Sequence, residues 1–69
     1  MTRDELFRTA ETCLENSRAC LDKAAEISVL FSKSGLKAYH EIHNTYCEQA
    51  NTWSTLAREA LNIAKATPL

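Results

Sequence analysis

The chain has 69 residues, with 8 basic and 9 acidic side chains and a formal net charge of −1 at pH 7. This balance argues against a protein whose whole surface attracts nucleic acid or an anionic membrane. The length predicts a single domain over 1–69, and such a domain buries only about 60% of the surface that its unfolded chain exposes. We therefore expect a disulfide, a metal ion or a second subunit to add to its stability.

The first predicted element is a helix over about 3–33. Thr2 and Glu5 match the capping box, in which each side chain accepts a hydrogen bond from the backbone amide of the other residue. From Leu6 to Phe31, apolar or small residues recur at steps of three and four, and this spacing places them on one side of a helix. The stripe consists of Leu6, Ala10, Cys13, Ser17, Cys20, Ala24, Ile27 and Phe31.

A turn at about 34–35 follows, because Gly35 is the only glycine and can adopt the left-handed conformation that ends many helices. A second helix is predicted over about 36–66, since no proline occurs before Pro68. Its stripe consists of Leu36, Tyr39, His43, Tyr46, Ala50, Trp53, Ala57, Ala60 and Ala64. We thus predict an all-α fold, an antiparallel helical hairpin of two long helices. A turn at Gly35 pairs residues whose numbers sum to about 70, such as Ala10 with Ala60.

The apolar surface is wider than the contact between two helices requires. We predict that a second copy covers it, so that two hairpins form a homodimeric four-helix bundle. The predicted interface between the copies consists of Phe7, Leu14, Leu21, Ile42, Leu56 and Ile63. The alternative fold is a three-helix monomer, in which the first helix breaks near 28–34 and folds back.

In layout and length, the predicted hairpin resembles the plasmid-encoded Rop-type proteins, which dimerise into four-helix bundles and bind paired RNA loops. The resemblance implies an RNA-binding bundle as an alternative function. No residue motif accompanies it, so no functional residue follows from it. RNA binding requires a contiguous cationic face, whereas the basic residues here are interspersed with acidic ones, and we do not expect nucleic acid as the partner.

The candidate metal ligands are His40, His43 and Cys47, which recur at steps of three and four along the second helix. Imidazole and thiolate groups suit zinc or copper. Packing inside the bundle explains the same residues, so we predict no metal and no cofactor, and a metal- or small-ligand-binding bundle stays as an alternative. The three cysteines are expected to be reduced in a cytoplasmic protein, because no apolar run at the N-terminus resembles a signal peptide and no stretch approaches the ~20 apolar residues of a membrane span.

The outward side of the second helix is polar but carries few charges. Asn and Thr are indifferent helix formers, so helix propensity does not explain their use there. A weakly charged surface is less costly to desolvate against another protein, although a solvated face is the simpler interpretation. The predicted partner-binding residues are Asn44, Asn51, Thr52, Thr55 and Asn62.

The sequence lacks a glycine-rich phosphate loop, an acidic pair in a cleft and a nucleophile with a neighbouring base. We therefore expect no enzyme. The predicted function is that of a small interaction or regulatory protein that self-associates and binds another protein. Its size suits an accessory or inhibitor protein of a phage or plasmid.

Overall fold

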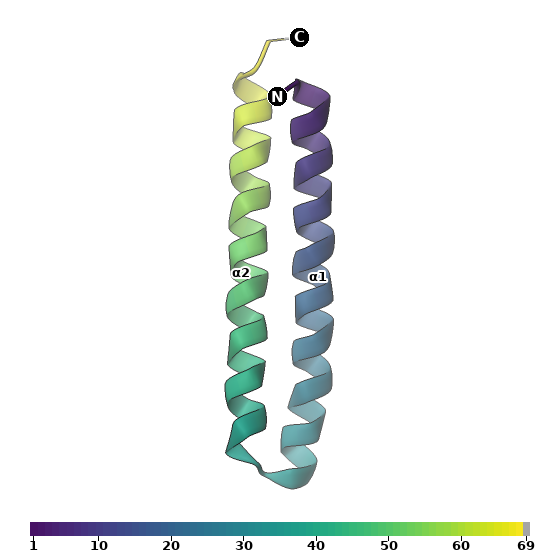
Figure 1. Ribbon diagram of the computed structural model, residues 1–69, viewed down its shortest axis with the longest axis vertical. Coiled ribbons are helices and arrows are strands. Elements are labelled where there is room, and N and C mark those ends of the chain that lie inside the picture. The colour runs from purple at the N-terminus through teal and green to yellow at the C-terminus, as the bar shows by residue number, and fades with distance from the viewer. Residues whose placement is uncertain (69) are drawn as a thin grey trace.

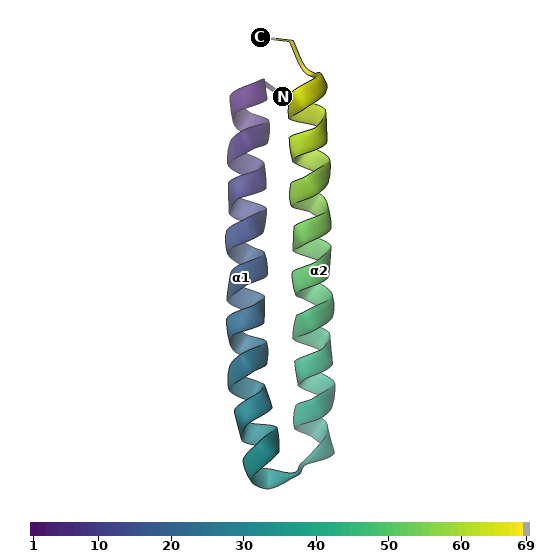
Figure 2. The ribbon, with the colours of Figure 1, turned by 180° about the vertical axis from the view of Figure 1, so that it is seen from behind.

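A computed structural model describes residues 1–68 as two long helices that pack side by side in a hairpin (Figure 1). Helix α1 spans Arg3–Ser34 and helix α2 spans Lys37–Ala66. The start of α1 and the end of α2 lie at one end of the hairpin and the turn lies at the other, which is also clear from behind (Figure 2). The Cα atoms extend over 53 × 13 × 12 Å. The predicted all-α hairpin is confirmed.

The predicted capping box begins α1. The Glu5 amide donates to Thr2 Oγ1 at 3.1 Å, and the Thr2 amide donates to Glu5 Oε1 at 3.4 Å. The carboxylates of Asp4 and Glu5 also lie in the first turn, where the helix dipole favours negative charge. These interactions fix the start of the helix that the sequence predicts.

The turn is formed by Gly35 and Leu36, one residue later than predicted. Gly35 adopts the left-handed conformation, with φ 69° and ψ 9°, and its amide donates to the Phe31 carbonyl at 2.7 Å. Because α1 continues without a break as far as Ser34, the three-helix alternative is wrong.

The contact between α1 and α2, which we call the seam, consists mainly of small side chains. Its buried residues all belong to the two predicted stripes: Leu6, Ala10, Cys13, Ser17, Ala24, Ala50, Ala57, Ala60 and Ala64. Four of them, Ala10, Cys13, Ala57 and Ala60, form one cluster, against which Trp53 packs. The contacts of Ser17 with Ser54, of Cys20 with Gln49 and of Phe31 with His40 join residues whose numbers sum to about 70, in agreement with the predicted register.

One polar side chain is buried in the seam. The Ser17 hydroxyl donates to the Ala50 carbonyl at 3.0 Å and lies 2.8 Å from the Ser54 hydroxyl. Since Ser17 has a single hydroxyl hydrogen, Ser54 is the donor in the second contact. Toward the turn the seam is looser: Tyr39, His43 and Tyr46 are half-buried.

The alanine seam leads to a test of how closely the helices must approach. Ala10 is 1% exposed, so Ala10→Leu forces the helices apart and lowers the free energy of unfolding by about 1–3 kcal/mol. Ala19 is exposed on the same helix, and Ala19→Leu leaves the stability nearly unchanged. Urea unfolding followed by circular dichroism measures both variants. An increase in stability with Ala10→Leu would show that close approach is not required.

Candidate functional site

The apolar side chains predicted at an interface are not covered by the seam. Five of the six are exposed, by 41% to 55% of their surface: Leu14, Leu21, Ile42, Leu56 and Ile63. The sixth, Phe7, is half-buried, and the Arg3 guanidinium lies 5.6 Å from the centre of its ring. These side chains remain available to a partner after the hairpin has formed.

These six side chains lie on two opposite faces of the hairpin. With the seam residues at heptad positions a and d, each helix has a row at position e and a row at position g beside the seam. In an antiparallel pair, the two e rows border one side of the seam and the two g rows border the other side. The first face, the Leu14 face, contains Phe7, Leu14, Leu21, Cys47 and Leu61. The second face, the Leu56 face, contains Leu30, Ile42, Leu56 and Ile63.

Contacts between the helices agree with this division. On the side of the Leu14 face, the Ser17 and Ser54 hydroxyls lie 2.8 Å apart, and the rings of Phe31 and His40 lie 5.5 Å apart. On the other side, Cys20 Sγ lies 4.0 Å from Oε1 of Gln49. A single second copy packed on one side of the hairpin therefore cannot cover the whole predicted interface.

The candidate metal ligands lie along α2 near the turn. Cys47 Sγ is 3.8 Å from Nε2 and 4.0 Å from Nδ1 of His43, so these two side chains are neighbours. The rings of His40 and His43 are stacked, with their centres 6.5 Å apart, and His40 Nε2 is 3.5 Å from the Asn44 amide nitrogen. Within residues 1–68, no group of three or more His, Cys, Asp or Glu side chains could hold a metal ion.

All three cysteines are free. Cys13 is buried in the seam, where it acts as a small apolar side chain. Cys20 contacts Gln49 on one side of the seam, while Cys47 contacts His43 toward the other side. The two half-buried thiols therefore face apart.

The predicted partner-binding residues are all exposed on α2: Asn44, Asn51, Thr52, Thr55 and Asn62. Thr52 Oγ1 donates to the Glu48 carbonyl at 3.1 Å, so its hydroxyl hydrogen is already used within the helix. Between Glu41 and Arg58, the only acidic or basic side chain other than histidine is Glu48. A partner would therefore meet amide and methyl groups on this side of α2, with little charge to desolvate.

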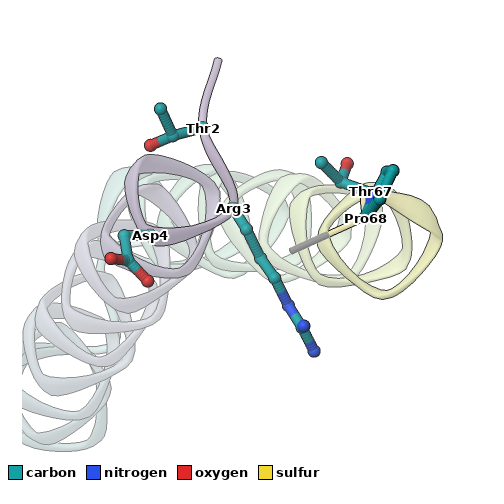
Figure 3. A pocket seen from close by; sticks show the side chains of 5 residues that line it. All are labelled: Thr2, Arg3, Asp4, Thr67 and Pro68. Atoms are coloured by element: carbon teal, nitrogen blue, oxygen red, sulfur yellow. The ribbon is translucent and has the colours of Figure 1, made fainter.

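A shallow hollow of about 350 Å³ lies between the chain ends, lined by Thr2, Arg3, Asp4, Thr67 and Pro68 (Figure 3). The Arg3 side chain extends across it, and its buried Nε has no hydrogen-bond partner among the described residues. Because only the ends of the two helices form its walls, a small molecule there would stay in contact with water.

Comparisons with family models, with curated proteins and with solved structures find no match to this chain. Neither α1 nor α2 contains a stretch that is long and apolar enough to cross a membrane. The features of the hairpin that bear on its function are therefore the two apolar faces and the polar side of α2.

The pairing of His43 with Cys47 leads to a prediction about metals. Two ligands are fewer than the four of a structural zinc site, so we expect a chelator to shift the melting temperature by less than about 1 °C. The measurement is thermal unfolding of the purified protein, with and without added zinc and then chelator. A larger decrease in chelator that Cys47→Ser abolishes would establish a metal site at this pair.

Proposed function

We propose that this chain is a small, non-enzymatic interaction protein that self-associates and binds another protein. The observation that carries the proposal is the exposure of large apolar side chains on both faces of the hairpin, among them Leu14 at 50% and Leu56 at 43%. Apolar surface of this kind gains about 25 cal/mol per Å² when it is removed from water. Exposed apolar patches are typical of surfaces that meet another macromolecule.

The composition of the seam supports self-association. No large side chain among residues 1–68 is fully buried, and six of the nine buried residues are alanines, each with only a methyl group to bury. Two helices joined in this way bury little apolar surface relative to the backbone that they order. Packing two hairpins together would bury one apolar face of each, as in a four-helix bundle.

The polar side of α2 supports the binding of a different protein. Thr55 and Asn62 lie on the side of α2 that faces directly away from α1, and Thr52 lies next to them beside the Leu56 face, so all three remain exposed when the Leu14 face is covered. Because few charges accompany them, another protein could cover them at a small desolvation cost. We propose that this surface recognises the partner.

The class that we propose is a regulatory protein of the cytoplasm, such as an accessory or inhibitor protein of a phage or plasmid. Three free thiols suit a reducing compartment, because glutathione and thioredoxin keep cytoplasmic cysteines reduced. A chain of 69 residues is sufficient for a protein that acts only by occupying a surface of its target.

The partner surface is tested by replacing Thr52 and Thr55 together with arginine. We expect the double variant to lose at least about 90% of partner binding, because two new cations would have to be desolvated at the contact. Helicity and oligomer mass should stay unchanged. The measurement is retention of proteins from a lysate of the source cells on the immobilised wild-type and variant chains.

The matched control is Thr12→Arg with Ala19→Arg, which adds the same charge to exposed positions on the outer side of α1. This control should retain the proteins that the wild-type chain retains. Equal retention by the two double variants would remove the polar side of α2 from consideration as the partner surface.

A further inference from the structure

We propose that the second copy packs on the Leu14 face and that the turns of the two hairpins lie at the same end of the bundle. This proposal rests on the self-association proposed above and specifies its geometry. It assigns the interface to one of the two opposite faces and predicts which side chains meet across it.

The choice of face follows from the charge that a second copy would have to cover. On the Leu14 face, the α1 row contains Phe7, Leu14 and Leu21 at three successive heptads, and the neighbouring α2 row contains no charged residue between Cys47 and Leu61. The Leu56 face is interrupted at its centre by Lys23 and Gln49, which are both exposed. Lys23 also forms a 3.4 Å ion pair with Glu26, and covering it would desolvate that charge. A second copy would therefore bury the Leu14 face at a lower cost.

The two helices offer complementary shapes on the Leu14 face. The α1 row carries the large side chains of Phe7, Leu14 and Leu21. At the same heights along the hairpin axis, the α2 row carries Leu61, Ser54 and Cys47. The Ser54 and Cys47 side chains are small and half-buried, so they fill less space on this face than the leucines of α1. The hairpin thus presents large side chains on α1 beside smaller ones on α2.

This arrangement decides the symmetry of the dimer. A two-fold axis parallel to the helices places α1 of one copy on α2 of the other at the same height, so that Leu14 meets Ser54 and Leu21 meets Cys47 of the second copy. An axis perpendicular to the helices would stack each helix on itself, with Leu14 against Leu14 and Ser54 against Ser54. The first arrangement packs large side chains against small ones, while the second packs small ones against each other and would leave a void between the α2 helices.

The charges that border the Leu14 face agree with the parallel axis. The next row of α1 carries Asp4 and Glu11, and the corresponding row of α2 carries Lys65 and Arg58 at the same heights. All four are exposed, and the described residues contain no ion pair between α1 and α2. With the turns together, Asp4 would lie beside Lys65 and Glu11 beside Arg58 of the second copy, each pair occurring twice.

The same row of α2 contains Asn44 and Asn51, which would lie at the edge of this interface. Of the predicted partner-binding residues, Thr52, Thr55 and Asn62 then remain on the outside of the bundle. The self-association surface and the proposed partner surface are therefore separate, which allows each to be tested without disturbing the other.

The face is tested with Leu14→Glu and Leu56→Glu, which place the same charge at the same height on opposite faces. We expect Leu14→Glu to raise the dissociation constant of the dimer at least about 100-fold, because the carboxylate would be buried without a partner. Sedimentation equilibrium under reducing conditions should give the mass of one chain for this variant and of two chains for Leu56→Glu. Because the measurement is a mass, it is valid whether or not the separated hairpin stays folded.

The outcomes separate this proposal from the proposed function. A wild-type chain that sediments as a monomer at all concentrations would overturn self-association itself. A wild-type dimer that Leu56→Glu dissociates, or that Leu14→Glu leaves intact, would overturn only the assignment to the Leu14 face.

The symmetry is tested by exchanging charges at the edge. Glu11→Arg alone should weaken the dimer about 10-fold at low salt, and adding Arg58→Glu in the same chain should restore most of the affinity. The perpendicular axis would place Glu11 beside Arg18 of the second copy. Restoration by Arg18→Glu in place of Arg58→Glu would therefore overturn the turns-together arrangement.

Discussion

Close packing of small side chains between α1 and α2 is the interaction on which the hairpin depends. Ala10, Ala57 and Ala64 are almost completely buried, and their methyl groups let the two helices approach closely in the half of the seam that lies away from the turn. The small size of these side chains also limits the apolar surface that the seam can bury, because the larger apolar side chains lie beside the seam and not within it. The exposed leucines and isoleucines of the two faces lie beside this alanine seam, and the proposal of self-association rests on them.

Much of the fold could be predicted from the sequence because its signals are local. The capping box at Thr2 and Glu5, the single glycine at Gly35 and the recurrence of small residues every three or four positions depend only on neighbours along the chain. The helix ends differ from the prediction by one residue at the turn, where Leu36 belongs to the connection. Such ends depend on details of backbone geometry that residue spacing does not determine.

The division of the apolar surface into two faces was not predicted, although the sequence contains the signal for it. In the sequence, Phe7 and Leu14 each come directly after a seam residue of α1, whereas Leu56 and Ile63 each come directly before a seam residue of α2. Within a single helix, both pairs are simply residues beside the seam. Their separation becomes clear only when the helices are placed antiparallel, since equivalent heptad positions then share a side.

The candidate metal ligands could be predicted only in part. The neighbouring positions of His43 and Cys47 follow from helical spacing, but the direction of His40 toward Phe31 depends on the packing of the two helices.

If the hairpin is half of a larger bundle, as we propose, its melting temperature depends on the protein concentration. Unfolding of a dimer releases two chains, so a 100-fold increase in concentration should raise the melting temperature by roughly 5–10 °C. Circular dichroism of the wild-type chain under reducing conditions measures this shift. A melting temperature that stays constant over the same range would show that the hairpin is stable alone, and would contradict self-association.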